Sequence, residues 1–590
     1  MSSTSGGPTP LPTTPETPAV LRRPEPAWHI PEPAPARAAR AVARTHGLAH
    51  PLVAQILLRR GLVDDALAYY LRPDVGTLYD PSTLRYMGEA VRVVDEAVRS
   101  GRKITVYGDY DVDGTTGASL LESYLRFRGA DVRSFIPMRF EGYGLSKSSI
   151  ERIAKEQKPE LILTVDCGTS SRTEVDLARS LGMEVVVTDH HLPTPGKETT
   201  GIVVNPHIGS EAYENRALAG VAVGYKLVTA MHGSHPLANL DLVALGTIAD
   251  VMSLTGENRV LVRAGLERLG HTRRTGLKAL LRTVATEQPC GHGGAESCFP
   301  VTAEMVAFQI GPRINAIGRM GLDPMLVVDL FTTSDEEKAA AIATQLDEAN
   351  RERRATTNKL VDEAMAAVDH AAPVIVLQMD VFKGIAGLVA GRLASEFGKP
   401  TIIIDPDGHG SARSVEGVDL LRTLQGSYGN LASAAGHSMA MGISNVTDVA
   451  ALRAALEKHD WPDTAGLRAI HIDAVCELAD LDRDLLRSLR ALEPTGAGNP
   501  VPLFAVSNVI VDEVRTMSEG RHAKLRLAAP DGTKKSAIWF NHGGALPAVG
   551  DRVDVAGRPT ENSFRGITTV ELQVTALRTT ATPLPLTLTA

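Results

Sequence analysis

The chain has 590 residues, 43% of them hydrophobic, and a formal net charge of −8, so it is long enough for about three to five domains with sizeable cores. No stretch reaches the ~20 apolar residues that a membrane helix needs, and the N-terminus lacks the basic-then-apolar pattern of a signal peptide. Its 4 scattered cysteines are typical of a reducing compartment. Composition therefore favours a cytoplasmic protein with no membrane association.

Two helical or irregular segments are expected at the start of the chain. Residues 1–27 are rich in Pro, Thr, Ser and Gly and predict a disordered tail. Residues 28–100 have an Ala-rich helical periodicity, interrupted by Gly61, Pro73 and Pro81. We expect an N-terminal helical region there.

The pattern changes over residues 101–255, where apolar runs alternate with amphipathic stretches. The runs are 104–107, 132–136, 161–165, 185–187 and 202–204. Continuous apolar runs with helices between them are typical of a parallel sheet that is covered on both faces. This segment therefore predicts an α/β lobe.

The remaining chain predicts a connector, a second lobe and a barrel. Residues 256–368 return to a helical pattern, with one long linking helix expected over 336–363. Residues 369–468 predict a second α/β lobe, with strands at 374–377 and 401–404 and a helix at 385–397. Residues 469–590 predict an OB-type β-barrel, because short strands recur between turn residues at 503–507, 509–515, 523–527, 536–540, 552–555 and 569–576. The expected fold class is α/β, two α/β lobes joined by a long helix, plus this C-terminal barrel.

Acidic and imidazole side chains follow the ends of the apolar runs in the first lobe. They are Asp109, Asp111 and Asp113 after the first run, Asp166 after the third, Asp189, His190 and His191 after the fourth, and Asp250 after the apolar segment 242–249. Open α/β sheets bind ligands beyond the carboxyl ends of their strands. Carboxylates this crowded repel one another unless cations lie between them. The set predicts two divalent metal ions, Mn²⁺ in preference to Mg²⁺, and hydrolysis of a phosphate ester.

Other interpretations of the same residues are weaker. Residues 109–114 resemble the start of an EF-hand loop, but the twelfth loop position is Leu120 instead of Glu and the motif follows a strand. Cys290, His292 and Cys298 would make half a zinc site, and no second half is evident. Each Asp after a strand could also be a helix cap or turn former. The metal prediction therefore depends on the whole set.

These motifs resemble the DHH phosphoesterase superfamily, and their order is similar to its bacterial branch of single-strand-specific 5′→3′ DNA exonucleases. Residues 109–114, 165–168, 189–191 and 246–251 match the motifs of the superfamily. Residues 311–319 are more particular to the exonuclease branch, and 413–414 and 436–437 resemble the substrate-binding signatures of the second, DHHA1-type lobe. The chain departs from the family at Ala435 and at residues 381–383, which leaves details of that lobe's pocket open.

The resemblance implies a role for each matching residue. The metal ligands would be Asp111, Asp113, Asp166, His190 and Asp250, with Asp166 as the bridge. The other catalytic residues would be His191, on the substrate side or behind the metal ligands, Asp189, which would orient its neighbour, and Asp109, as a metal ligand or an acid behind the ligands. Substrate phosphates would be bound by Arg313, Asn315, Arg319, Ser411, Arg413 and His437. Arg319 or Arg413 could instead pair with a buried acid, and His437 could be a core histidine.

The resemblance also implies an activity: release of 5′-mononucleotides from single-stranded DNA by two-metal hydrolysis, in DNA recombination and repair. The barrel would hold the strand through its cations and through Trp539 or Phe540. Single-stranded DNA is the expected partner, a single-strand-binding protein or a helicase are further candidates, and we expect a monomer. Two alternatives stay open. One is a DHH-type phosphodiesterase of short oligonucleotides or cyclic dinucleotides, and the other is a non-catalytic replication scaffold.

Overall fold

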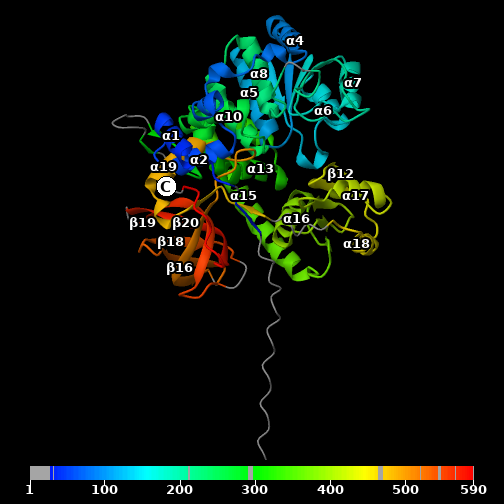
Figure 1. Ribbon diagram of the computed structural model, residues 1–590. Coiled ribbons are helices and arrows are strands. Elements are labelled where there is room, and N and C mark those ends of the chain that lie inside the picture. The colour runs from blue at the N-terminus through cyan, green and yellow to red at the C-terminus, as the bar shows by residue number, and fades with distance from the viewer. Residues whose placement is uncertain are drawn as a thin grey trace, which may run out of the picture. The chain divides into compact units, whose positions relative to one another are not determined.

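The computed structural model describes residues 27–30, 32–209, 213–286, 288–289, 297–462, 469–518, 520–542, 546–564 and 567–588. The chain divides into two compact units, a larger one of residues 57–467 and 487–501 and a smaller one of residues 1–56, 468–486 and 502–590 (Figure 1). Most of the expected tail, and Cys290 and His292 of the zinc alternative, lie outside the described residues. No helix in the described ranges combines the length and apolarity needed to cross a bilayer.

The larger unit contains the predicted parallel sheet. Its strands are β2 (Ile104–Gly108), β3 (Val132–Phe135), β4 (Leu161–Val165), β5 (Glu184–Thr188) and β6 (Ile202–Val204), in the order β3-β2-β4-β5-β6. All four pairings are parallel. Because the chain goes from β2 to β3 on one side and then to β4 on the other, the strand order reverses between β2 and β4. Ligands of open α/β sheets bind at such a switch point.

Helices cover both faces of this sheet, which is why its strands are apolar throughout. Successive residues of a strand point to opposite faces, and Val106 of β2 packs into one buried cluster while Tyr107 packs into another. The helices of this lobe are α3 (Asp64–Leu71), α4 (Met87–Ser100), α5 (Val112–Phe127), α6 (Lys147–Glu156), α7 (Arg172–Ser180) and α8 (Gly220–His232).

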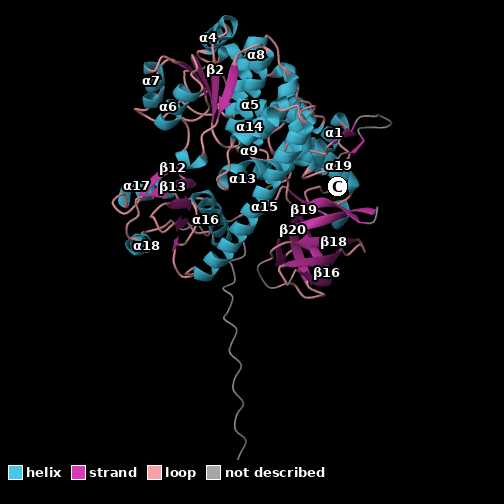
Figure 2. Ribbon diagram, turned by 180° about the vertical axis from the view of Figure 1, so that it is seen from behind, coloured by secondary structure: helices cyan, strands magenta, loops and turns pink. Residues whose placement is uncertain are grey.

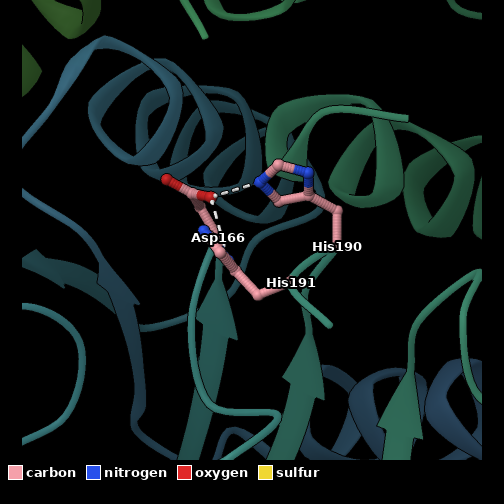
Figure 3. A group of neighbouring side chains, drawn as sticks. All are labelled: Asp166, His190 and His191. Atoms are coloured by element: carbon pink, nitrogen blue, oxygen red, sulfur yellow. Dashed lines mark ion pairs between the residues drawn. The ribbon is translucent and has the colours of Figure 1, made fainter. Parts of the chain in front are cut away.

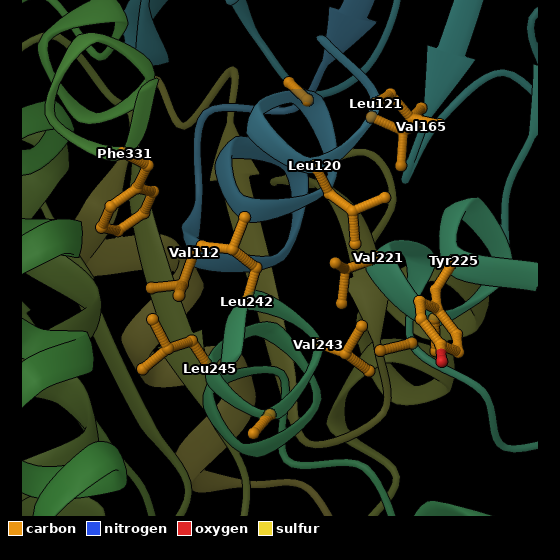
Figure 4. Close-up of a cluster of buried hydrophobic side chains, with 14 of the residues drawn as sticks. Val112, Leu120, Leu121, Val165, Val221, Tyr225, Leu242, Val243, Leu245 and Phe331 are labelled. Carbon is orange, nitrogen blue, oxygen red and sulfur yellow. The ribbon is translucent and has the colours of Figure 1, made fainter. Parts of the chain in front are cut away.

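A helical body follows the sheet and supplies most of the core. It contains α9 (Leu240–Ala249), α10 (Gly256–Gly270), α11 (Thr275–Arg282), α12 (Ala303–Met305), the π-helix η5 (Val306–Ile310), α13 (Gly311–Arg319), α14 (Met325–Thr332) and the short strands β7 (Gln288–Pro289) and β8 (Ser297–Cys298). Figure 4 shows Val112 and Leu120 of α5 beside Leu242 and Leu245 of α9. Helix α9 packs against α5, α8 and α10 and is buried on nearly every side, so its C-terminal end is held firmly.

One long helix, α15 (Glu336–Ala367), connects this body to the second lobe, as the charged stretch predicts. It packs against α11, α13 and α14 and against α16 (Lys383–Phe397) of the second lobe (Figure 2). That lobe has one sheet in the order β12-β13-β11-β10-β9. Its remaining elements are β9 (Ile375–Gln378), β10 (Thr401–Ile404), β11 (Gly410–Arg413), α17 (Leu420–Ser427), β12 (Ser433–His437), β13 (Ala440–Ser444) and α18 (Val449–Glu457).

The smaller unit is built on a closed barrel of five strands. They are β16 (Phe504–Met517), β17 (His522–Ala528), β18 (Lys534–Trp539), β19 (Arg552–Phe564) and β20 (Ile567–Thr579), and pairing of β16 with β19 closes the sheet. Residues 503–507 and 509–515, expected as two strands, belong to β16. A register shift near Asn508, whose φ is 56°, marks the expected break. The accompanying elements are β1 (Trp28–His29), α1 (Ala36–His46), α2 (Pro51–Arg59), β14 (Ile470–His471), β15 (Ala474–Cys476) and α19 (Arg483–Leu489). The predicted fold class is thereby confirmed.

Candidate metal centre

The first acidic motif connects β2 to α5. Asp111 is the N-cap of α5, and its Oδ1 accepts hydrogen bonds from the backbone N–H groups of Asp113 at 2.9 Å and Gly114 at 3.1 Å. Asp113 lies in the first turn, and its carboxylate accepts the N–H groups of Gly220 at 2.6 Å and Val221 at 2.9 Å. The cap interpretation of Asp111 is therefore correct, and it does not exclude a ligand role, because a carboxylate has two oxygens.

Asp166 follows β4, on the other side of the switch point. Its φ of 64° is in the left-handed region, which is uncommon for a residue with a side chain. The first residue of α8 lies against it: a Cβ on Gly220 would be 2.5 Å from the Asp166 Cβ and 2.7 Å from its Cα. Glycine at position 220 therefore allows α8 to approach Asp166 closely enough for its N–H groups to bind Asp113.

His190 brings an imidazole to the same point. Its Nε2 lies 3.1 Å from Asp166 Oδ1, 3.5 Å from Asp250 Oδ2 and 3.8 Å from Asp113 Oδ2 (Figure 3 shows the Asp166 contact). Burial, and then the neighbouring His191, lower the pKa of His190 to about 4. The ring is therefore neutral at physiological pH, which is the form that binds metals.

Four buried polar atoms in this group have no hydrogen-bond partner among the described residues. They are Asp109 Oδ2, Asp166 Oδ1, His190 Nε2 and Asp250 Oδ2. A buried polar atom without a partner is costly, so several of them pointing at one place indicate a missing ligand. The donor set, carboxylate oxygens with one imidazole nitrogen, suits Mn²⁺ or Mg²⁺.

The ligand atoms form two triads that share no residue. One comprises Asp113, His190 and Asp250, the other Asp109, Asp111 and Asp166, and within each the candidate atoms lie within 4.8 Å of one another. A third grouping, Asp166 with His190 and His191, overlaps both. Asp166 belongs to the second triad and lies 3.1 Å from His190 of the first. Two triads linked in this way have the composition expected of a two-ion centre. Asp250 comes from the end of helix α9 and not from a strand.

The pKa values of the acids show how strongly the cluster disfavours bare negative charge. Burial, and then Asp111, raise the pKa of Asp113 to about 7. Burial, and then Asp113, raise the pKa of Asp250 to about 8 and that of Asp166 well above its usual range. Burial, and then Asp111, do the same to the pKa of Asp109. Divalent cations would reverse this preference, because each stabilises the ionised carboxylates around it.

Asp189 and His191 form a separate pair beside the cluster. The Asp189 carboxylate accepts the N–H groups of His190 at 2.7 Å, His191 at 3.2 Å and Thr169 at 2.9 Å, and lies 2.8 Å from His191 Nδ1. Burial, the largest single cause, would raise the pKa of Asp189, but the hydrogen bond from His191, the charges of both histidines and the Thr169 N–H together outweigh it and lower the pKa. Burial would likewise lower the pKa of His191, but the hydrogen bond to Asp189 and the charges of Asp189, Asp250 and Asp113 together raise it to about 9. Asp189 therefore turns its oxygens to the backbone and to His191.

A cluster of arginines lies near the motif that begins at Asp109. Burial, and then Arg139, Arg353 and Arg413, lower the pKa of Arg319 to about 9. The Arg139 guanidinium stacks 4.7 Å above the ring of Tyr110. Arg319 Nη1 donates to the Gly384 carbonyl, 3.0 Å away in the first turn of α16. Mutual repulsion of this kind marks a place where an anion would bind. Arg139 and Arg353 were not predicted from the sequence, since neither lies in a recognisable motif.

The other expected phosphate-binding residues lie on the same unit, and of these Arg413 belongs to the arginine cluster. Arg313 is paired with Asp347 of α15, with Nη2 2.9 Å from Oδ1, and Asn315 lies half-buried on α13. Ser411, Arg413 and His437 share one face of the second sheet, because Arg413 pairs with Ala440 and Ala440 with His437, and Ser411 is two residues from Arg413. The guanidinium of Arg413 packs on α16, where a Cβ on Gly387 would lie 2.8 Å from its Nη2.

Several cations on the barrel strands are paired with acids. Lys534 Nζ lies 3.0 Å from Asp512, Arg526 Nη2 lies 2.8 Å from Glu513, and Arg515 also pairs with Glu513. Phe540 is exposed at 45%, whereas Trp539 is only half-buried and contacts the ring of His542. The barrel surface is thus of mixed charge, with an exposed aromatic side chain at the end of β18.

Comparison with known proteins supports the assignment of both the first lobe and the barrel. The model of the DHH family, N-terminal domain, matches residues 103–247, and the model of the RecJ OB domain matches residues 472–576. The single-stranded-DNA-specific exonuclease RecJ of Bacillus subtilis is 33% identical over 535 residues, which span 87% of this chain and 66% of the relative. The RecJ of Thermus thermophilus is 34% identical over 506 residues, 84% of this chain and 71% of the relative. The chain thus spans about two thirds of the length of these two relatives.

Solved structures of the Thermus protein resemble this one over nearly its whole length. RecJ in complex with Mn²⁺ matches with a TM-score of 0.79 and 31% identity, over 94% of this chain and 80% of that one. The complex of the same protein with Mg²⁺ matches with a TM-score of 0.74. These are the two ions that the donor set of the present cluster favours.

Proposed function

The chain belongs to the RecJ family, and on this basis we propose that it is a metal-dependent exonuclease specific for single-stranded DNA. The observation that carries the proposal is the convergence, at the switch point of the first sheet, of four buried atoms that have no partner in the described part of the chain, from three strand ends and one helix end. The relatives are specific for single-stranded DNA, and this supports the same substrate class here. The two-ion chemistry comes from the donor set.

Two divalent ions bound here would activate a water molecule and stabilise the leaving oxygen of an in-line displacement at phosphorus. The ions would be held by Asp111, Asp113, Asp166, His190 and Asp250. Asp166 belongs to one triad and lies 3.1 Å from His190 of the other, so it is the natural bridge. Asp109 has one oxygen free to join them, since only its Oδ1 is used, by the Gly144 N–H at 3.1 Å.

Two further residues act beside the ions. Asp189 holds His191 through Nδ1 and also fixes the backbone of both histidines. His191 then faces the substrate side of the cluster, where a cationic imidazole would bind a phosphate oxygen.

The arginine cluster is the proposed site for the terminal phosphate of the strand. Arg139, Arg319 and Arg413 repel one another in the absence of an anion, and Arg319 also holds the first turn of α16, whose N-terminal N–H groups favour negative charge. Ser411 and His437 lie on the same face of the second sheet as Arg413 and complete the expected pocket. A phosphate held there would fix which bond lies next to the ions, which makes cleavage end-dependent.

One experiment tests the activity and its polarity. Single strands labelled at the 5′ or the 3′ end are incubated with the full chain and Mn²⁺ or Mg²⁺. We expect labelled mononucleotide to be released at once from the 5′-labelled strand, and progressively shorter labelled products from the other. Absence of cleavage with either ion would refute the activity, and release of labelled mononucleotide first from the 3′-labelled strand would refute the polarity.

A matched pair of variants tests the phosphate site. Arg319→Gln removes a member of the arginine cluster, whereas Arg313→Gln removes an arginine that is already paired with Asp347. The first should raise KM for 5′-phosphorylated strands by about tenfold or more, as the loss of a charge-assisted bond implies, and the second much less. Equal effects of both variants would contradict the assignment.

We also propose a monomer that acts in the cytoplasm, in DNA recombination and repair, with a single-strand-binding protein or a helicase as partner. A solution mass near 62.8 kDa by light scattering would support the first statement. A mass of twice that value would contradict it.

A further inference from the structure

A loop from the edge of the first sheet reaches the ends of three other strands. This loop, residues 138–146, is part of the connection from β3 to α6. The Tyr107 hydroxyl at the end of β2 donates to the Gly144 carbonyl at 2.9 Å, and the Gly144 N–H donates to Asp109 at 3.1 Å. The Tyr143 hydroxyl lies 3.1 Å from the Asp166 carbonyl oxygen after β4 and 2.7 Å from His191 Nε2 after β5. The loop is therefore fixed to every strand end that supplies the metal centre.

The backbone on both sides of Tyr143 is in the left-handed region. Gly142 has a φ of 104° and Gly144 a φ of 73°. A Cβ on Gly142 would meet nothing within 4 Å, and one on Gly144 only the Cβ of Cys167 at 3.9 Å. Conformation and not crowding thus requires glycine here. Two such residues turn the chain sharply on either side of Tyr143 and direct its hydroxyl to His191.

The imidazole of His191 is held at both nitrogens. Asp189 Oδ1 lies 2.8 Å from Nδ1, and the Tyr143 oxygen lies 2.7 Å from Nε2 and 3.2 Å from Nδ1. The tyrosine is therefore closer to the nitrogen that Asp189 leaves free. The two rings meet edge to face, with centroids 5.2 Å apart and planes at 68°. Asp189 alone would allow the ring to pivot about the Nδ1 bond, whereas a second partner close to Nε2 restricts this rotation.

We propose that Tyr143 is a positioning residue for His191, whose imidazole it holds against the metal centre through its hydroxyl group. This inference rests on the proposed function, in which His191 contacts the substrate. The competing interpretation is structural: the hydroxyl would only tie the loop to the Asp166 carbonyl. The two interpretations differ in what happens when His191 is absent.

The test is Tyr143→Phe, which keeps the ring and removes only the hydroxyl. Loss of a residue that orients an active-site histidine costs about 10- to 100-fold in activity, so we expect kcat to fall by that factor. KM for the strand and the Mn²⁺ concentration for half-maximal activity should stay within about twofold, because the arginine cluster loses no contact and Asp166 loses one only at its backbone carbonyl, so no carboxylate or imidazole atom that would bind an ion is affected.

The matched control is Tyr428→Phe. Tyr428 also pairs with a histidine, its oxygen lying 3.1 Å from His459 Nδ1 with the rings edge to face at 5.7 Å, but this pair belongs to the second lobe and includes no proposed site residue. This variant should keep the kcat of the unmodified chain. An equal loss in both variants would show a general effect of removing a tyrosine hydroxyl and would overturn the proposal.

Two further measurements separate positioning from a structural role. In a His191→Ala background Tyr143→Phe should have no additional effect on kcat, since the group it positions is gone. A crystal structure of metal-free Tyr143→Phe should show the His191 ring rotated from its original orientation. A full additional loss in the His191→Ala background, or an unmoved ring together with an unchanged kcat, would overturn the proposal. If the unmodified chain cleaves no single strand, the proposed function fails, while the orientation of the ring in the crystals still decides the role of Tyr143.

Discussion

At the scale of single residues, the metal centre combines a strained backbone conformation with buried polar atoms, and both are energetically unfavourable. Asp166 has a left-handed backbone and a buried oxygen to which no described residue donates a hydrogen bond, and this oxygen lies 3.1 Å from an imidazole that is neutral. Backbone strain and partnerless polar atoms concentrate at functional sites, where a ligand compensates for them. Asp166 is therefore the residue whose change should affect metal chemistry most and the fold least.

We predict that Asp166→Asn lowers Mn²⁺-dependent cleavage by more than about a hundredfold. Substitution of a residue that only orients a metal ligand already lowers activity by about 10- to 100-fold, and Asp166 is a proposed ligand itself. The side chain keeps its shape and loses the charge that attracts both ions. Binding of single strands, measured by fluorescence anisotropy without metal, should change little. Near-full activity of this variant would show that Asp166 is not a ligand.

The raised pKa values predict how the metal-free protein responds to pH. The pKa of Asp113 is about 7 and that of Asp250 about 8 in the folded chain, against about 4 for an exposed Asp. The folded state therefore binds protons that the unfolded state has lost, and this stabilisation is complete below pH ~4 and disappears as the pH rises through 7 and 8. His190, with its pKa lowered to about 4, acts in the opposite direction below pH ~6.5, but it is one group against several acids.

The melting temperature of EDTA-treated protein should accordingly be lower at pH 8 than at pH 5. Mn²⁺ should raise it more at pH 8, where the ligands are ionised. Asp250→Asn serves as the control, because it removes one of the shifted groups and should reduce the difference between the two pH values. A metal-free protein that is more stable at pH 8 would contradict the account of the cluster.

Single residues also differ in how far the sequence predicts their role. The crowding of Asp109, Asp111 and Asp113 predicts a metal site because charge repulsion is local in the sequence. The pairing of Arg313 with Asp347, and the contact of Tyr143 with His191, depend on how distant segments pack, and nothing in the local pattern indicates either.

At the scale of elements, helix α8 is the part that fixes the site. Its first two N–H groups bind Asp113, and its first residue leaves no room for a Cβ beside Asp166. We predict that Gly220→Ala pushes α8 or Asp166 away and lowers Mn²⁺-dependent cleavage by about a hundredfold, as a 1 Å misplacement at an active site does.

Gly224→Ala, one turn later on the same helix, is the matched control. Its Cβ would come no closer than 3.5 Å to Val165, which is an ordinary contact, and the two substitutions add the same methyl group to the same helix. Circular dichroism should show both variants folded, with activity lost only in the first. Equal activity of the two would mean that the approach of α8 to Asp166 is not critical.

Elements were predictable where one physical signal dominated. The strands of the first sheet are buried on both faces, so their apolar runs predict β4 at its observed bounds and β2 to within a residue. Helix α9 is buried nearly all round, so its apolar run has no helical face to recognise. Strand β16 was predicted as two strands because Asn508, at a register shift, resembles a turn.

At the scale of the whole molecule, the fold class could be predicted but the assembled phosphate site could not. Arg139 follows the edge strand of the first sheet, Arg319 ends α13, Arg353 lies on α15 and Arg413 on β11. Only the packing of α15 and α16 brings such separate positions into one electrostatic cluster. Motif resemblance indicated two of the four because they are in signatures, and packing supplied the other two.

The last prediction concerns how the chain as a whole recognises a long strand. Because several of the barrel cations are paired with acids, fewer of them are available to phosphates, and we expect about four phosphate contacts in all. A single strand then gives a slope of about −3 in a plot of log affinity against log salt, so raising NaCl fourfold should weaken binding about fiftyfold. A dinucleotide, with one internal phosphate, should lose only about threefold.

The measurement is the dissociation constant of a metal-free complex with a long strand and with a dinucleotide, at two salt concentrations. Phe540→Ala should weaken the long strand at both concentrations without changing the slope, because stacking is not screened by salt. Equal slopes for the two ligands would mean that only the site around the ions binds nucleic acid. In that case the chain would be a phosphodiesterase of short oligonucleotides, with the barrel free for another purpose.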